Sequence, residues 1–385
     1  MKKSIGGAFL VVGTTIGAGM LSLPLITAAC GLPTAIILTV MSWSVMYYTG
    51  LKLITVCATE KAGVNYTSLI RKKMPKYLQI IFTFIYLLLL YSLMAAYTTQ
   101  GASLVHLISQ SQTRIVSVDS ITFILLFGSL VLSTRLSDYI NRSFVSVKLI
   151  FYTLCIISMI FFIKYHNFFT LPISISALIF AWPTLLPSFG FQNMIPVLYE
   201  YQQGDVKAVK KSVFIGSVSV LIIYIIWLIV CLGVLTQQDY NMIYQQGNTL
   251  SALIDTIKNS TESSSINTFL SVFINISVIT SFICVGLSLY HYLKDTLINI
   301  GIQINRVSGY ILTFTPPFIF TIFYPKGFIL ALQYAAIFAV VIFVYTPIYL
   351  DRKSKKSFKV YYPIILGSLV IIAQITNLIG LTTPF

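Results

Sequence analysis

The sequence predicts an all-α protein that crosses a membrane many times, and three observations lead to this fold class. Of the 385 residues 57% are hydrophobic and only 9% are charged, whereas a soluble domain carries about 25% charged residues. The apolar residues gather in runs of about 20, the length that a helix needs to cross the hydrocarbon core. The basic residues fall mostly in alternate loops between these runs.

The apolar runs, separated by charged or turn-rich breaks, give eleven predicted transmembrane helices. They cover residues 5–28, 33–58, 77–107, 119–136, 143–164, 174–199, 212–235, 266–292, 307–323, 327–349 and 360–381. The fourth has a short apolar part, Ile121 to Thr134, and its separation from the fifth at Arg135–Arg142 keeps the topology consistent. In the polar loop 236–265, apolar residues at helical spacing from Thr249 to Ile257 predict a short surface helix.

The loop charges predict the orientation of the chain. If Lys2 and Lys3 are cytoplasmic, the cytoplasmic loops hold most of the remaining basic residues of the loops. These are Arg71, Lys72, Lys73, Lys76, Arg135, Arg142, Lys207, Lys210, Lys211, Lys294, Arg306, Arg352, Lys353, Lys355, Lys356 and Lys359, against Arg114, Lys164, Lys258 and Lys326 on the other side. The positive-inside rule then predicts an inner-membrane protein with a cytoplasmic N-terminus and a periplasmic C-terminus. Although the net charge is +15, no basic cluster on a soluble face indicates nucleic acid.

The first predicted helix carries residues that weaken it near its middle. The run Gly13-Thr14-Thr15-Ile16-Gly17-Ala18-Gly19-Met20 holds three glycines and two threonines, and each glycine costs a helix about 1 kcal/mol relative to alanine. A broken helix is tolerated in lipid only where protein or a cavity supplies partners for its main chain. The alternative is close packing of an unbroken helix through its small residues.

The sixth predicted helix carries a matching interruption, Pro187-Ser188-Phe189-Gly190-Phe191-Gln192 between Trp182-Pro183 and Pro196. Interrupted helices at corresponding positions of two halves point to the central site of a transporter. We therefore expect an inverted five-plus-five repeat in a single membrane transport domain, residues 1–385. Repeat one covers about 5–164, repeat two about 174–349, and an extra helix about 360–381.

The ends of broken helices can bind both charged groups of an amino acid. Free N–H groups at a half-helix N-terminus bind a carboxylate, and carbonyl groups at a half-helix C-terminus bind an ammonium group or a cation. We therefore predict a substrate clamp in the two breaks. It comprises Thr14, Thr15, Gly17, Ala18, Gly19, Ser188, Phe189 and Gly190. Tyr91, Tyr97, Phe189 and Phe191 are candidates for the side-chain pocket, with packing or lipid contact as the alternative for each.

Ion coupling has two candidate arrangements, because no Asp or Glu lies deep in a predicted helix. The carbonyl groups of Gly13 and Ile16 with the hydroxyl groups of Thr280 and Ser281 would form a sodium-type site. Alternatively, Lys148 in the fifth helix would bind and release a proton in each cycle. Snorkelling of Lys148 to the interface and ordinary hydrogen bonds between helices remain the alternatives. We expect no cofactor and no structural metal beyond a proton or sodium as coupling ion.

Several motifs, in order along nearly the whole chain, carry a family resemblance. They are GTTIGAGMLSLP (13–24), Tyr91-Ser-Leu-Met-Ala-Ala-Tyr97, Ser188-Phe-Gly-Phe with Ile195-Pro196, Gly216-Ser217 with Tyr224 and Trp227, and Pro316-Pro317. The chain resembles the hydroxy and aromatic amino acid permease family, most closely its tyrosine permeases, within the amino acid–polyamine–organocation superfamily. The resemblance implies a LeuT-like fold of eleven helices and uptake of an aromatic amino acid by proton symport, with tyrosine favoured and tryptophan or phenylalanine open.

The chain departs from the family pattern at three positions. The family usually has histidine where this chain has Gln192, an Asp-Tyr pair where it has His291-Tyr292, and proline where it has Val220. The first two departures concern side chains that a coupling scheme would otherwise use.

Other function classes fit the sequence less well. A carrier of another neutral amino acid, or a sodium-coupled version, is the nearest alternative. An integral-membrane enzyme is a distant one, because His106, His166 and His291 are far apart in the sequence and no nucleophile motif is present. No GxxxxGK[ST] loop indicates ATP-driven transport, and no filter sequence or charged ring indicates a channel. The expected partners are the amino acid and the bilayer, and nothing indicates an obligate protein partner.

The two predicted breaks give a direct test. We expect Gly17→Leu or Gly190→Leu to abolish amino acid uptake while leaving membrane insertion intact, because the bulky side chain would fill the space beside exposed main chain. Uptake by proteoliposomes and the amount of protein in the membrane fraction measure the two effects. Normal transport by either variant would remove the predicted site.

Overall fold

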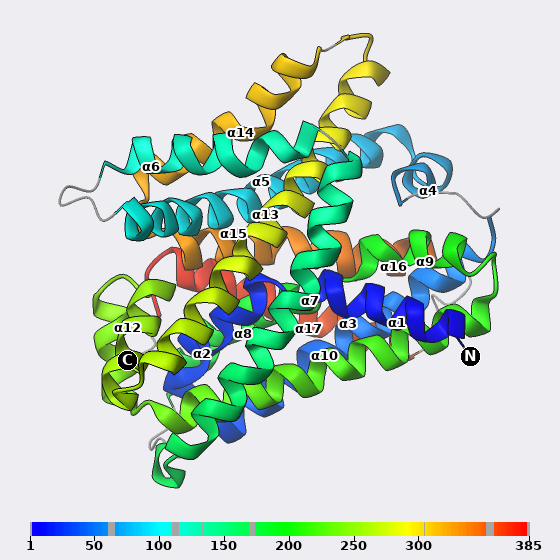
Figure 1. Cartoon of the computed structure of the whole chain (residues 1–385). Coiled ribbons are helices and arrows are strands. Elements are labelled where there is room, and N and C mark those ends of the chain that lie inside the picture. Colours follow the sequence, from blue (N-terminus) through cyan, green and yellow to red (C-terminus); the bar gives the residue numbers. More distant parts are fainter. Residues whose placement is uncertain are drawn as a thin grey trace. The chain divides into compact units, whose positions relative to one another are not determined.

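The computed structural model describes residues 2–60, 66–109, 115–132, 134–168, 174–303, 305–351 and 358–382. Within these ranges the chain forms helices and no strand, as Figure 1 shows, so the all-α class is confirmed. Five of the basic residues used for the orientation, Arg114, Arg352, Lys353, Lys355 and Lys356, lie outside the described residues.

The chain divides into two compact units. Unit 1 comprises Met1–Tyr86, Phe169–Ile229 and Ala336–Phe385, and unit 2 comprises Leu87–Phe168 and Val230–Ala335. Each unit contains segments from both predicted repeats, and the repeat boundaries stay a prediction. Both interrupted helices, the first and the sixth, belong to unit 1.

Unit 1 holds the elements around the two interruptions. They are α1 (Lys2–Thr15), α2 (Ala18–Thr27), η1 (Ala28–Cys30), α3 (Leu32–Cys57), α4 (Tyr66–Lys73), the start of α5 (Lys76–Ser109), α8 (Ile175–Leu185), η6 (Pro187–Phe189), η7 (Gln192–Met194), α9 (Ile195–Tyr201), most of α10 (Val206–Val234), η8 (Val340–Tyr345), α16 (Thr346–Leu350) and α17 (Phe358–Leu378). The short α4 is tied to η8, because the buried Tyr66 hydroxyl donates a hydrogen bond of 2.6 Å to the Ile342 carbonyl.

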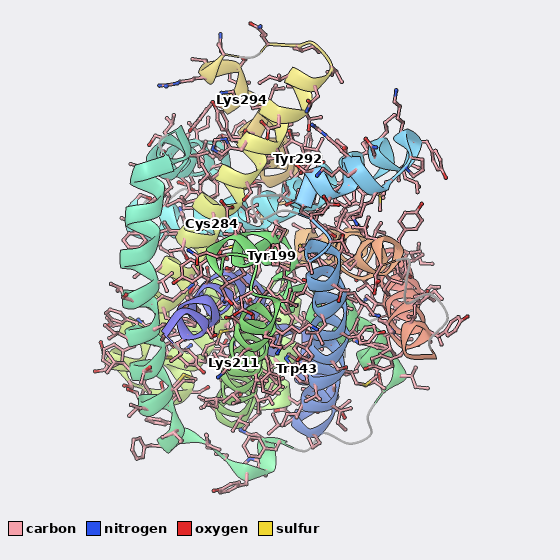
Figure 2. All side chains as sticks on the ribbon, turned by 90° about the vertical axis from the view of Figure 1, so that its right-hand side faces the viewer. Trp43, Tyr199, Lys211, Cys284, Tyr292 and Lys294 are labelled. Atoms are coloured by element: carbon pink, nitrogen blue, oxygen red, sulfur yellow. The ribbon has the colours of Figure 1, made fainter. Side chains whose placement is uncertain are left out.

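Unit 2 is built around two long helices that pack along each other, α7 and α13. Its other elements are the rest of α5, α6 (Val116–Phe123), η2 (Ile124–Gly128), η3 (Ser129–Leu132), η4 (Ile160–Phe162), η5 (Tyr165–Phe168), α11 (Gln237–Gln245), α12 (Leu250–Thr261), α14 (Arg306–Phe323) and the start of α15 (Phe328–Ala339). The pair itself is α7 (Thr134–Met159) and α13 (Ser264–Asn299). Cys284, Tyr292 and Lys294 mark the course of α13 in Figure 2.

Eight helices of the described ranges are long and apolar enough to cross a membrane, or nine if α1 and α2 together count as one bent helix. The fourth and ninth predicted helices are the remainder, and the total of eleven stays a prediction. The ninth corresponds to α14, with 18 residues. The fourth is irregular: the helix widens to a π-turn at η2, where the Tyr310 hydroxyl donates to the Ile124 carbonyl at 2.8 Å.

The polar loop contains more structure than the sequence reading predicted. The expected surface helix is α12, which begins after the N-cap Thr249 and buries Leu253 and Ile257 on one face. A second helix, α11, was missed. Its signal was present in the sequence, because Thr236 and Asp239 form a capping box that satisfies the first N–H groups of the helix.

Close approach of α10 to α1 fixes the first interrupted helix within unit 1. A Cβ atom at Gly216 would lie 2.7 Å from the Val11 Cβ and 2.9 Å from the Ala8 carbonyl oxygen. A residue larger than glycine would therefore push the two helices apart, since contacts below about 3 Å between such atoms are strongly repulsive. This contact carries α10 directly past the end of α1.

Candidate functional site

The first predicted helix is broken, as expected. α1 ends at Thr15, α2 begins at Ala18, and the segments on either side are bent by 56°. Gly17 between them is extended, with φ −145° and ψ −154°. We call residues 16–17 the first break. The prediction of an interrupted rather than merely small-residue helix is confirmed here.

The two threonines beside the first break use their side chains within α1. The Thr14 hydroxyl donates to the Leu10 carbonyl, and the buried Thr15 hydroxyl donates to the Val11 carbonyl at 2.7 Å. Their side chains are therefore committed to the preceding turn. The predicted clamp uses main-chain groups at these two residues, and it stays a prediction.

The sixth helix is broken over a longer stretch, residues 186–194, which we call the sixth break. It runs from the end of α8 at Leu185 through η6 and η7 to α9. The N–H groups of Phe189, Gly190 and Phe191 donate to Leu186, Pro187 and Phe189 at 3.2, 2.9 and 3.0 Å. These three amides are therefore used in local turns.

One side chain connects the two breaks. Tyr224 on α10 is fully buried, and its hydroxyl lies 2.8 Å from the Thr15 carbonyl oxygen and 2.8 Å from the Ser188 carbonyl oxygen. Its ring packs against Phe189, with centroids 4.9 Å apart. Sequence reasoning noticed Tyr224 only within a family motif. The missed signal is a tyrosine inside an apolar helix, whose buried hydroxyl needs a partner.

A second contact joins the sixth break to the first turn of α2, directly after the first break. The Ser188 hydroxyl lies 3.2 Å from the Gly19 carbonyl oxygen and 3.0 Å from that of Thr184. A Cβ at Gly19 would lie 3.0 Å from the Ser188 Oγ and 3.1 Å from its Cα. Gly19 therefore allows a close approach of α2 to the sixth break, in addition to the interruption of the first helix at Gly17.

The half-helix ends place opposite partial charges close together in the chain. The carbonyl end of α1 carries partial negative charge, and the N–H end of α2, which begins only three residues later, carries partial positive charge. In the first turn of α2 the Met20 N–H donates to the Gly17 carbonyl at 3.1 Å. The N-terminal end of a helix can bind an anion through its main-chain N–H groups. Binding of the ammonium group and the carboxylate of one small molecule at the first break stays a prediction.

The aromatic candidates of the sixth break have packing roles within unit 1. Phe189 and Phe191 are fully buried. Phe191 lies against α3, where a Cβ at Gly50 would be 2.8 Å from its ring. Beside it, the Gln192 amide donates to the Met46 carbonyl at 3.1 Å and to the Thr49 hydroxyl at 3.2 Å. Gln192 thus anchors the sixth break to α3, a role that the sequence did not reveal.

The other two aromatic candidates belong to unit 2, on α5. The Tyr91 hydroxyl donates to the Leu312 carbonyl of α14 at 2.8 Å. The Tyr97 hydroxyl is hydrogen-bonded to the Ser281 side chain of α13. Both rings are therefore oriented by bonds to neighbouring helices. Ser281, predicted as an ion ligand, shares its hydroxyl with a predicted pocket residue.

The remaining coupling candidates are divided between the units. Gly13 and Ile16 lie in unit 1, and Lys148, Thr280 and Ser281 lie in unit 2. The Thr280 hydroxyl bonds to its own helix, to the Ile276 and Ser277 carbonyls at 2.9 and 3.1 Å. Lys148 on α7 is only 2% exposed. Its ammonium group is therefore enclosed by protein within unit 2.

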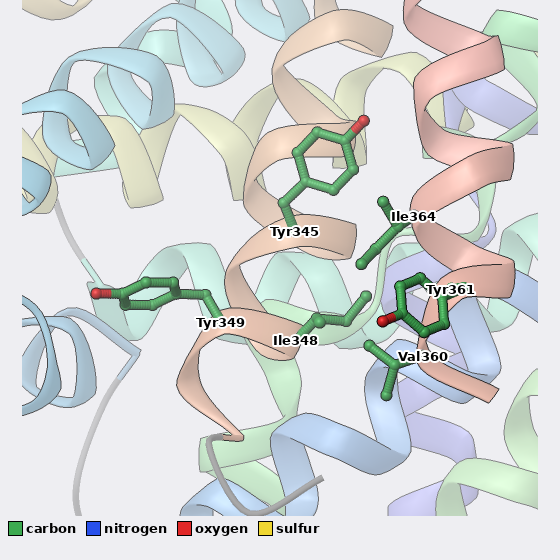
Figure 3. A pocket seen from close by; sticks show the side chains of 6 residues that line it. All are labelled: Tyr345, Ile348, Tyr349, Val360, Tyr361 and Ile364. Atoms are coloured by element: carbon green, nitrogen blue, oxygen red, sulfur yellow. The ribbon is translucent and has the colours of Figure 1, made fainter. Parts of the chain in front are cut away.

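A separate apolar cavity of about 440 Å³ lies between α16 and α17 (Figure 3). Its lining is Tyr345, Ile348, Tyr349, Val360, Tyr361 and Ile364. No predicted site residue belongs to this lining. The cavity is therefore distinct from the two breaks.

Comparison with known proteins identifies the family of the chain. The model of the tryptophan/tyrosine permease family matches residues 1–383. The chain belongs to this family. The permease is 35% identical to "Tyrosine-specific transport system 1" of Haemophilus influenzae, over 93% of this chain and 90% of that protein. It is 28% identical to a "Tryptophan-specific transport protein" of the same organism, over 99% of this chain and 97% of that protein.

Solved structures share the fold of the permease. A crystal structure of the Eremococcus coleocola manganese transporter, in complex with an aromatic bis-isothiourea compound, superimposes with a TM-score of 0.63 over 98% of this chain and 87% of that one. The two sequences are only 14% identical, so the likeness concerns the fold alone. The expected LeuT-like class is confirmed, with interrupted first and sixth helices.

The contact between Gly19 and Ser188 predicts a specific sensitivity. We expect Gly19→Ala to weaken substrate binding and lower the stability of the permease by about 1–3 kcal/mol, because the new methyl group overpacks against the sixth break. Gly6→Ala is the matched control, since its Cβ would meet mainly the far end of the Tyr201 side chain. Ligand titration and thermal unfolding measure both effects. Equal behaviour of the two variants would show that the close approach is unimportant.

Proposed function

We propose that the permease is a secondary transporter that imports an aromatic amino acid, tyrosine foremost, across the inner membrane by alternating access. The observation that carries the proposal is the meeting of the two breaks, joined by the Tyr224 hydroxyl and by Ser188 against Gly19. Main-chain N–H and C=O groups that lack their helical hydrogen bonds inside a membrane cost free energy unless a bound molecule or another part of the protein supplies a hydrogen-bond partner.

The polar end of the substrate is bound by main chain in this proposal. The carbonyl groups of Thr15 and Ser188 accept hydrogen bonds from the α-ammonium group. The N-terminus of α2, at Gly17, Ala18 and Gly19, receives the α-carboxylate through N–H groups and the helix dipole. Because these contacts involve only atoms common to all amino acids, selectivity has to arise elsewhere.

The aromatic preference is inferred from the relatives. Proteins named as tyrosine-specific and tryptophan-specific transport proteins are similar to this chain over more than nine-tenths of its length. The higher identity, 35% against 28%, is to a tyrosine-specific system. Tyr91 and Tyr97 stay candidates from the sequence for the side-chain pocket, and their hydroxyl groups bond to neighbouring helices of unit 2.

Proton symport through Lys148 is the coupling scheme that we favour. An ammonium group enclosed among helices, with no aqueous exposure beyond 2%, gains or loses a proton only when the transport cycle changes its surroundings. The alternative is a sodium ion held by the Gly13 and Ile16 carbonyls with Thr280 and Ser281. The hydroxyl of Thr280 donates to the Ile276 carbonyl of its own helix, which leaves its oxygen lone pairs for a cation, so the choice between the two schemes depends on the burial of Lys148 and on the gradient experiment below.

The orientation in the membrane follows from the charges of the loops. The N-terminus is cytoplasmic and the C-terminus periplasmic in this proposal, because the basic residues concentrate on one side. The chain acts as a carrier and not as an enzyme, and needs no cofactor other than its coupling ion.

Uptake of labelled tyrosine, tryptophan and phenylalanine into proteoliposomes tests the proposal, with proton and sodium gradients imposed separately. We expect accumulation of tyrosine driven by the proton gradient alone, with unlabelled tyrosine as the strongest competitor. Accumulation of a different neutral amino acid would reassign the substrate, and dependence on sodium would reassign the coupling ion. No accumulation of any amino acid would refute the transport function.

The role of Lys148 gives a separate expectation. Lys148→Met should reduce proton-driven accumulation to simple equilibration, because the variant cannot bind the coupling proton, while exchange of external for internal tyrosine continues. Lys164→Met, at an exposed position in unit 2, is the control. Undiminished accumulation by Lys148→Met on a proton gradient would exclude this lysine from coupling.

A further inference from the structure

The hydroxyl of Tyr224 occupies an unusual place, between two carbonyl oxygens that belong to different helices. The distances are 2.8 Å to the Thr15 oxygen at the end of α1 and 2.8 Å to the Ser188 oxygen in η6. The side chain has no solvent exposure. Its position therefore depends only on the protein around it.

The position of this hydroxyl is fixed from two directions. The ring packs on Phe189 in the sixth break, at a centroid distance of 4.9 Å. Two turns earlier on the same face of α10, Gly216 brings the helix against Val11 of α1. Movement of the hydroxyl relative to either break would require one of these contacts to open.

The hydrogen-bond capacity of this group is incomplete. A phenol carries one hydrogen, whereas each carbonyl oxygen has two lone pairs. Tyr224 can therefore donate fully to only one of the two oxygens at a time. An α-ammonium group has three N–H donors, so the acceptor capacity that Tyr224 leaves matches what that group needs.

We propose that Tyr224 is a positioning residue, which holds the Thr15 and Ser188 carbonyl groups at the separation that receives the substrate's α-ammonium group. This inference rests on the proposed function and deepens it. Tyr224 does not itself recognise the aromatic side chain. Its hydroxyl sets how strongly the site distinguishes a ligand with an ammonium group from one without it.

The test compares two ligands on two variants of the purified full-length permease. The ligands are L-tyrosine and 3-(4-hydroxyphenyl)propionate, which lacks only the amino group. The variants are Tyr224→Phe and the matched control Tyr66→Phe, which also removes a buried hydroxyl bonded to a carbonyl, at 2.6 Å from Ile342. Affinities are obtained by competition against labelled tyrosine, and thermal unfolding compares the stability of the variants.

We expect Tyr224→Phe to reduce the preference for tyrosine over the analogue by about tenfold, because carbonyl groups that are no longer held in position lose part of their hydrogen bonds to the charged ammonium group. The affinity for the analogue should be unchanged, and Tyr66→Phe should keep the native preference. A parallel loss for both ligands would indicate a purely structural role and overturn the inference, as would an unchanged preference.

Failure of the proposed function gives a different result, because the native protein would then not bind tyrosine at all, and the inference would fall with it. If Tyr224→Phe does not insert into the membrane, 3-fluorotyrosine introduced at position 224 replaces it. Its hydroxyl is a stronger hydrogen-bond donor, so the preference for tyrosine should rise above the native value. A preference equal to the native one would overturn the inference.

Discussion

The structure of this permease depends on the need of main-chain polar groups for partners inside a membrane. Water satisfies the ends of helices in a soluble protein, but lipid cannot, and each unpaired group costs several kcal/mol. The two breaks are tolerated because side chains reach them: Tyr224 reaches two carbonyl groups, and Ser188 reaches the Gly19 carbonyl. The same arrangement leaves acceptor capacity at these carbonyl groups, so the requirement that stabilises the fold also supplies the main-chain groups of the site that we propose.

Much of this arrangement was predictable from the sequence. The break in the first helix follows from the density of glycine around Gly17, and the break in the sixth follows from Pro187 and Gly190, because these residues weaken any helix. The long apolar helices follow from composition alone. Local backbone propensity determines where the first helix breaks. The observed break therefore lies beside the predicted substrate residues Thr14 and Thr15.

The contacts that join distant segments were not predictable. Nothing in the local sequence shows that Tyr224 meets Thr15, or that Gln192 binds α3 through Met46. Such bonds depend on which helices pack together, which is a property of the whole fold. The fourth helix was predicted but its irregularity was not, since the Tyr310 hydroxyl that bonds to the π-turn at η2 comes from α14. Polar side chains within apolar helices indicated that such hydrogen bonds exist, but they did not indicate which residues are the partners.

The contact of Gly19 with Ser188 constrains how this protein can change during evolution. The two positions are 169 residues apart in the chain, yet the atoms nearest to a Cβ at Gly19 include the Cα of Ser188. A smaller side chain at 188 would therefore not make enough room for a larger residue at 19. Diversification of one half of the gene is limited by the backbone encoded in the other, and relatives that alter position 19 should also have remodelled the main-chain path of the sixth helix.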